Sequence, residues 1–224
     1  MRVPSFKIAS LLPLLGLSTM TLWLAGCSSP ERPVAKHYGN QIEIQPSNPL
    51  RRGSADNLCE LFRDNPQWFV DAHHSYRRWG TPIAVQLAIV YQESRFIANA
   101  SPKSSFTVFS NKTSSAFGYA QALDGTWNDY VRSTGNYQAH RSNMRDSLDF
   151  IGWYNNNAIR KLGLTGSQVR ELYLAYHEGI KGYSMATYDN KTWLTTVADQ
   201  VEDRAIKYDK QLRSCSNEIV ALLK

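Results

Sequence analysis

The sequence lacks the motifs that mark a metal site or a serine-hydrolase site. It has no G-x-S-x-G segment, so the sharp turn that exposes the nucleophile of such hydrolases is missing. The segment 177–181, HEGIK, differs from the zinc motif H-E-x-x-H because Lys181 occupies the place of the second histidine. His73 and His74 are adjacent but have no matching ligand cluster. We therefore expect no metal and no cofactor.

Strand-like alternation of apolar and polar residues is nearly absent, and so are basic runs with interleaved aromatic residues. The first absence predicts a mainly α fold, and the second argues against nucleic acid as a partner. The chain carries 25 Lys and Arg residues against 19 Asp and Glu residues. This mildly basic balance suits either contact with anionic envelope material or an ordinary solvated surface.

The first 27 residues have the layout of a secretory signal. Arg2 and Lys7 form a short positive start, and the apolar run IASLLPLLGLSTMTLWLAG follows and ends at Cys27. A signal anchor that stays in the membrane is the alternative, but Pro13 and Gly16 interrupt the apolar run. We expect residues 1–26 to be removed on export.

The tetrapeptide LAGC, residues 24–27, resembles the lipobox of bacterial lipoproteins, in which the cysteine is acylated and becomes the mature N-terminus. The resemblance implies a lipidated Cys27 that anchors the chain to a membrane. Ser28, rather than an aspartate, follows the cysteine, which resembles the pattern for sorting to the outer membrane, facing the periplasm. Residues 27–54 hold four prolines and two glycines without sustained periodicity, so we expect a flexible tether there.

The two remaining cysteines, Cys59 and Cys215, lie near the two ends of the expected domain. Two cysteines in an oxidising compartment are expected to pair, and the bridge would tie the ends of the domain together. Two free buried thiols are the alternative. A disulfide would leave no thiol for a nucleophilic Cys–His pair.

Helical periodicity predicts one well-cored domain over residues 55–224. Its first helical segment is broken near Pro66 and ends at Gly80. Thr81 and Pro82 then offer a capping hydroxyl and a first-turn proline for the next helix. We expect a polar loop over residues 98–116 and further helices over residues 125–132, 142–162, 167–177 and 191–213.

The segment 88–96, AIVYQESRF, ends an apolar helical run with Glu93. Desolvation and the negative end of the helix dipole both raise the pKa of such a carboxyl and favour its protonated form. A carboxylic acid that stays protonated near neutral pH is what general-acid cleavage of a glycosidic bond requires. A salt bridge between Glu93 and Arg95 or another basic group is the alternative, and this segment alone favours it.

The segment 114–130, SSAFGYAQALDGTWNDY, leads from a polar loop into a helix. Gly118 permits close approach of the backbone. Tyr119 and Gln121 offer a stacking face and amide hydrogen bonds for a sugar. A simple turn with a core aromatic residue is the alternative.

Three short motifs occur in a fixed order. ES-x-F closes one helix, G-Y-A-Q follows, and A-Y-H-E-G closes another helix. This series resembles the soluble lytic transglycosylase family of lysozyme-like enzymes, which usually shows ES-x-F, then G-L-M-Q, then A-Y-N-A-G. The resemblance covers roughly residues 58–212. It implies a mainly α, lysozyme-like domain that acts on the glycan strands of peptidoglycan, and we expect this domain to be a monomer.

The resemblance assigns roles to individual positions. Glu93 matches the catalytic acid and base, and Ala120 departs from the family by replacing a methionine. His177 and Glu178 replace Asn and Ala, which adds titratable groups near the site. The positions expected to bind the substrate are Ser94, Gly118, Tyr119, Gln121, Tyr176, His177 and Glu178.

The resemblance also implies a non-hydrolytic reaction at the β-1,4 bond between N-acetylmuramic acid and N-acetylglucosamine. Glu93 would act first as the acid and then as the base, and the product would carry a 1,6-anhydro end. Tyr176 would hold Glu93 or the sugar in position. A hydrolytic muramidase is the nearest alternative and needs a second carboxylate, for which Asp124 and Glu178 are candidates. The second alternative is a lipoprotein that binds glycan without cleaving it.

Overall fold

The structure, a computed structural model, describes residues 54–102 and 114–223. The expected signal, the lipidated Cys27, nearly all of the tether and most of the loop over residues 98–116 lie outside the described residues. Within the described ranges no helix is both long enough and apolar enough to span a membrane.

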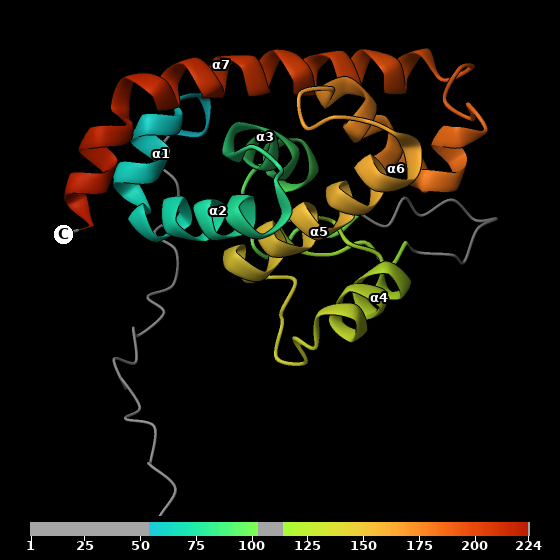
Figure 1. The fold of residues 1–224 in the computed structure, drawn as a ribbon, viewed down its shortest axis with the longest axis horizontal. Helices are drawn as coiled ribbons and strands as arrows, with labels where there is room; N and C mark the ends of the chain where they lie inside the picture. Colours follow the sequence, from blue (N-terminus) through green and yellow to red (C-terminus); the bar gives the residue numbers. More distant parts are fainter. Residues whose placement is uncertain (1–53, 103–113, 224) are drawn as a thin grey trace, which may run out of the picture. The chain divides into compact units, whose positions relative to one another are not determined.

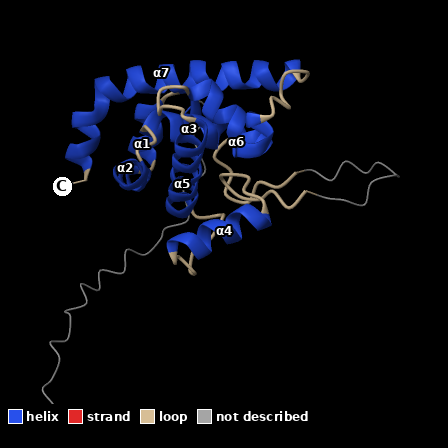
Figure 2. Ribbon diagram, turned by 45° about the vertical axis from the view of Figure 1, so that its right-hand side comes forward, coloured by secondary structure: helices blue, strands red, loops and turns tan. Residues whose placement is uncertain are grey.

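The described residues form a mainly α domain, which confirms the expected fold class (Figures 1 and 2). They contain no strand, only an isolated bridge between Phe117 and Ala122. The elements in chain order are a 3-10 turn η1 (Ser54–Asp56), α1 (Leu58–Asp64), α2 (Pro66–Trp79), α3 (Ile83–Ser94), α4 (Asp124–Thr134), α5 (Met144–Leu162), α6 (Val169–Ser184) and α7 (Thr192–Leu222).

Helix α3 lies at the centre of the domain because it is apolar around most of its circumference. Leu87, Ala88, Ile89 and Val90 are four consecutive residues with no exposed surface, and a helix that is apolar on all sides is buried by its neighbours. Helices α2, α5 and α7 all pack against it. The expected Thr81 cap is not observed, since Pro82 is the N-cap residue and makes no side-chain cap bond.

Helix α7 runs across α1, α3 and α6 on one side of the domain, and α4 lies on the other side (Figures 1 and 2). The expected helix over residues 191–213 is confirmed, and its buried side is apolar, with Leu194, Val201, Ala205 and Tyr208. The helix continues beyond the expected end at residue 213, where Cys215 and Ile219 remain buried. Cys215 forms the expected disulfide with Cys59 of α1.

Helix α6 extends past the expected end at His177 because Gly179 interrupts the helix without ending it. Gly179 has φ 79° and ψ 155°, and the chain then re-enters a helical conformation as far as Ser184. Glycine adopts this positive φ without the steric cost that a side chain would bring. The kink places His177 and Glu178 at the last turn of the first helical segment.

Aromatic residues join α4, α5 and α6 around Phe150. The ring of Phe150 is 5.3 Å from that of Trp127 and 6.3 Å from that of Tyr176, measured between centroids. Tyr154 packs edge-on against Tyr176 at 5.1 Å. Offset and edge-on pairs of this kind each add to the stabilisation that burial provides. They fix the face of α6 that is turned toward the end of α3.

Candidate active site

Glu93 is the last residue but one of α3 and is partly exposed, with one of its carboxyl oxygens buried. The Oε1 atom is buried and has no hydrogen-bond partner among the described residues. Burial raises the pKa of Glu93 from its ordinary value of 4.5 to about 7, and a hydrogen bond from Tyr173 opposes part of that rise. Because a buried carboxylate without a cation is costly, the protonated form is favoured up to near-neutral pH.

The alternative salt bridge between Glu93 and Arg95 is not observed. Arg95 caps α3 in the left-handed region, at φ 54° and ψ 34°. Its guanidinium lies over the ring of Tyr91, with Cζ 4.0 Å from the ring centroid. Within residues 54–102 and 114–223, no ion pair involves Glu93. The cation that would depress the pKa of Glu93 is therefore directed elsewhere.

Tyr173 of α6 hydrogen-bonds to the Glu93 carboxyl, a contact that the sequence did not indicate. Burial and the proximity of Glu93 both raise the pKa of Tyr173, so its hydroxyl stays protonated and can donate. Tyr176, expected to hold Glu93 or the sugar, lies close enough to Glu93 that burial and then the charge of Glu93 raise its pKa, and its hydroxyl donates to the carbonyl oxygen of Ala120 at 2.6 Å. Tyr173 precedes Tyr176 by three residues and so shares its helix face, which is the signal that could have identified it.

We expect Tyr173→Phe to shift the alkaline limb of the pH–activity profile upward by roughly one pH unit. The phenyl ring keeps the packing but loses the hydrogen bond that lowers the pKa of Glu93. Glu93 would then keep its proton to higher pH. The measurement is the initial rate of peptidoglycan solubilisation between pH 5 and pH 9.

Tyr176→Phe is the matched control for this prediction. It removes the bond to Ala120 and should leave the alkaline limb in place. A limb that moves with Tyr176→Phe but not with Tyr173→Phe would transfer the positioning role back to Tyr176.

Ser94 and Tyr119 do not present their side chains to a substrate. The hydroxyl of Ser94 donates to the carbonyl of Val90 at 3.0 Å, and the residue is 4% exposed. Tyr119 is 2% exposed, and its ring packs edge-on against Trp68. The alternative of a core aromatic residue therefore describes Tyr119, because a ring buried in the core cannot stack on a sugar.

Gly118 and Gln121 shape a tight loop between α3 and α4. Gly118 has φ 81°, and a Cβ atom there would lie 2.0 Å from the carbonyl oxygen of Arg141. The side-chain amide of Gln121 donates to the carbonyls of Ala100 and Gly118, at 2.8 and 2.9 Å. The nitrogen of that amide is used inside the loop, so only its oxygen remains available to a sugar. The backbone of Arg141, rather than a sugar, is what approaches Gly118 closely.

Arg141 holds this loop in place, and sequence reasoning did not identify it. Its guanidinium donates to the carbonyls of Ser115 and Ala122 at 2.9 and 2.8 Å and pairs with Asp124 at 2.8 Å. Its own carbonyl accepts from the backbone of Tyr119. These bonds hold the loop rigidly. Tyr176 adds a further hydrogen bond, from its hydroxyl to the carbonyl of Ala120 in the same turn.

Glu178 is tied to Lys191 rather than free to act on a substrate. Lys191 Nζ lies 2.7 and 2.8 Å from its two carboxylate oxygens, and Thr187 donates to the same group. These hydrogen bonds lower the pKa of Glu178 to about 2. His177 is exposed and touches both Glu178 and the ring of Trp193. The expected positions 177 and 178 thus form part of a charged cluster with Lys191, in which the Glu178 side chain is 7% exposed.

Glu93 lines neither of two surface depressions that lie on the described part of the chain. One, of about 460 Å³, is bordered by His73, His74, Arg77 and Arg78 of α2. The other, of about 340 Å³, lies between α3 and α7. No group of three or more potential metal ligands occurs among the described residues.

Comparison with known proteins gives one family. The family model described as "Transglycosylase SLT domain" matches residues 15–215. No curated protein and no solved structure matches the chain.

Proposed function

Because the chain belongs to the transglycosylase SLT domain family, whose lysozyme-like members are lytic transglycosylases of peptidoglycan, we propose that Glu93 is its sole catalytic acid and base. The observation that carries the proposal is the partly exposed carboxyl of Glu93, which has one buried oxygen without a hydrogen-bond partner and a pKa of about 7. A group with this pKa is present in both protonation states near neutral pH. It can therefore serve both proton transfers of one reaction.

In the first step, Glu93 donates its proton to the glycosidic oxygen between N-acetylmuramic acid and N-acetylglucosamine. The bond from C1 to that oxygen breaks, and charge develops on the muramic ring as an oxocarbenium-like state. The substrate's own N-acetyl group stabilises this centre, so a second protein carboxylate is not required. The hydroxyl of Tyr173 donates a hydrogen bond to the ionised Glu93 and stabilises it.

In the second step, the Glu93 carboxylate accepts the proton of the C6 hydroxyl of the same muramic residue. The C6 oxygen then bonds to C1 and closes a 1,6-anhydro ring, and Glu93 is again protonated. No water enters the balance. Positioned proton transfer of this kind typically contributes about 10²–10⁴-fold to the rate.

The states of the other carboxylates favour this route over hydrolysis. A hydrolytic muramidase needs a second carboxylate as base or nucleophile. Asp124 is paired with Arg141 and Glu178 with Lys191. Each would have to leave its cation to serve in the reaction, whereas the substrate's own N-acetyl and C6 hydroxyl groups need no second carboxylate.

Attachment to the envelope completes the proposal. Residues 1–26 act as the signal, Cys27 carries lipid at the outer membrane, and residues 27–54 tether a monomeric catalytic domain to it. Release of the chain from isolated membranes by detergent, but not by salt, is the check on this anchor.

Mass spectrometry of the digestion products tests the reaction. Purified protein incubated with peptidoglycan should release fragments whose muramic ends are about 18 Da lighter than hydrolysed ends, the mass of one water. Fragments with full-mass reducing ends would identify a hydrolase instead. Binding to peptidoglycan without any release of fragments would identify a glycan-binding protein.

A further inference from the structure

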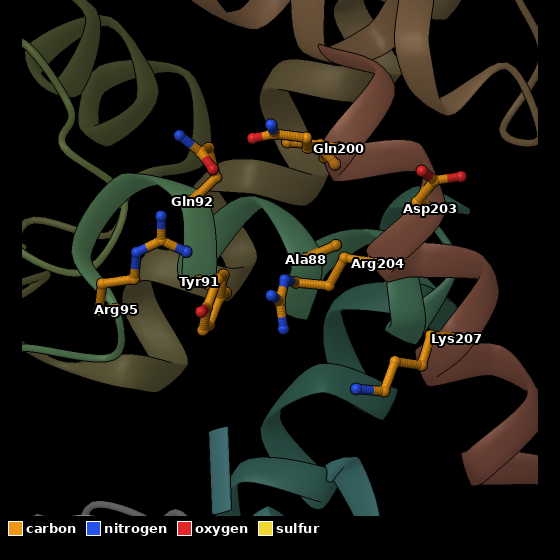
Figure 3. A pocket seen from close by; sticks show the side chains of 9 residues that line it. Ala88, Tyr91, Gln92, Arg95, Gln200, Asp203, Arg204 and Lys207 are labelled. Carbon is orange, nitrogen blue, oxygen red and sulfur yellow. The ribbon is translucent and has the colours of Figure 1, made fainter. Parts of the chain in front are cut away.

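A pocket of about 340 Å³ opens between the last turn of α3 and the middle of α7 (Figure 3). Its volume is at the lower end of the range for small-ligand sites in proteins. Gln92 and Arg95 line it and flank the Glu93–Ser94 pair in the chain. The pocket therefore lies within about one helical turn of the backbone of Glu93.

The pocket gathers cations that the described residues do not neutralise. Arg204 pairs with Asp56 at 3.1 Å. Arg95 and Lys207 form no ion pair within the described part of the chain, although Asp203 also lines the pocket. Beyond the Arg204–Asp56 pair, Arg95 and Lys207 outnumber the one carboxylate, Asp203, by one positive charge. An excess of positive charge at a concave surface favours the binding of an anion, because a concave protein wall strengthens its field.

Tyr91 fixes the direction of the two guanidinium groups. The Cζ atom of Arg204 lies 3.3 Å from the centroid of its ring, and that of Arg95 lies 4.0 Å away. Figure 3 shows the ring between these two side chains. A cation over an aromatic face is held by the ring quadrupole. The donors of Arg95 are thus positioned before any ligand arrives, which lowers the entropic cost of binding.

We infer that this pocket binds a carboxylate of the peptide stem that is attached to muramic acid in peptidoglycan. The inference rests on the proposed function, which brings that stem to Glu93. The carboxylate would be attracted by Arg95, Arg204 and Lys207, of which Lys207 is the flexible cation free to pair with it, and the stem would be recognised together with the glycan bond to be cleaved.

The amide side chains of the pocket favour a peptide over a phosphate group. Gln92 and Gln200 line the pocket beside the cations. Each amide offers both a donor and an acceptor, which matches the carbonyl and N–H groups of a peptide backbone. A phosphodiester offers acceptors only and would leave the amide oxygens without a donor. The combination of amides with cations therefore fits a short acidic peptide.

The kinetic test compares glycan strands that carry stems with strands from which an amidase has removed them. Wild-type protein should show a higher kcat/KM on the strands with stems. Lys207→Gln should reduce this preference by about threefold to tenfold, the range for a single partly exposed charge contact, and Lys207→Glu should reduce it further. Lys210→Gln is the matched control, since Lys210 is exposed on the same helix but does not line the pocket. Equal kcat/KM on both substrates, or an unchanged preference in Lys207→Gln, would overturn the inference.

A binding test separates this inference from the proposed function. The Glu93→Gln protein is titrated with free tetrapeptide stem, with the same peptide after amidation of its carboxylates, and with inorganic phosphate. We expect binding of the free stem and its loss in Lys207→Glu, with the amidated peptide binding more weakly. Phosphate that competes as well as the stem would show a site for phosphate-bearing polymers and overturn the peptide assignment. Stem binding by a wild-type protein that cleaves neither glycan substrate would contradict the proposed reaction and support the pocket.

Discussion

Replacing Glu93 by Gln should reduce turnover of peptidoglycan by about 10²–10⁴-fold, the usual contribution of a positioned acid–base group. The amide has nearly the shape of the carboxylic acid but neither donates nor accepts the proton in the reaction. Oε1 has no hydrogen-bond partner to lose among the described residues. The loss should appear in kcat for release of anhydro-ended fragments, while binding to intact peptidoglycan persists.

Glu202→Gln on α7 makes the same atomic change away from the site and should leave turnover as in wild type. Wild-type activity in the Glu93→Gln protein would remove Glu93 from the assigned role. Loss of activity accompanied by loss of the helical circular dichroism signal would instead identify a structural residue.

The same substitution should make the fold more stable at alkaline pH. Glu93 has a pKa of about 7 in the folded protein against 4.5 ordinarily. Between these values the folded state binds more protons than the unfolded state, so the free energy of unfolding falls as pH rises. Above pH 7 the cost of the buried charge reaches roughly 3 kcal/mol, given the shift of Glu93 from 4.5 to about 7. The uncharged amide of the Glu93→Gln protein avoids this cost.

Urea unfolding at pH 4.5 and pH 8 measures this difference. Glu93→Gln should gain stability relative to wild type at pH 8 and gain little at pH 4.5. A carboxylate held by a salt bridge would give the opposite sign, since its replacement would destabilise the protein at pH 8. The sign of the change therefore decides between the two interpretations of the segment AIVYQESRF.

The sequence predicted the features that follow from local periodicity and covalent order. The apolar run before Glu93 predicts a buried helix with the carboxyl at its end, and the structure contains both. The disulfide followed from the cysteine count and an exported chain, and it is present. The helices were predicted because apolar residues recur at helical spacing along the chain. Their ends were predicted less well, since a helix end depends on single residues such as Gly179.

Features that depend on distant neighbours could not be predicted in this way. Lys191 neutralises Glu178 across the kink in α6, and no local pattern connects them. Tyr119 is aromatic and next to a flexible glycine, which fits a sugar platform as well as a core position, and only packing against Trp68 decides it. Arg141 fixes the loop by donating to the carbonyl of Ala122, from which it is separated by 19 positions in the chain. Each of these is a tertiary contact that the sequence leaves open.

Removing the disulfide should cost about 2–5 kcal/mol of unfolding free energy, the range observed for native bridges. The bridge joins residues 156 positions apart, and a cross-link over so long a loop removes much of the conformational freedom of the unfolded chain. For a domain of this size the melting temperature should fall by roughly 5–15 °C. The measurement is thermal unfolding of a Cys59→Ser/Cys215→Ser protein beside wild type.

The helices α1 and α7 should nevertheless remain in contact without the disulfide. Arg63 pairs with Glu218 at 2.6 Å, and Gln211 accepts from the backbone of Leu58 at 2.9 Å. The double variant should therefore fold and retain turnover at 25 °C, because the bridge contains no residue of the proton-transfer site. Adding a reductant should lower the melting temperature of wild type to that of the variant and leave the variant unchanged. A melting temperature that the reductant does not change in wild type would mean that the two cysteines are free thiols.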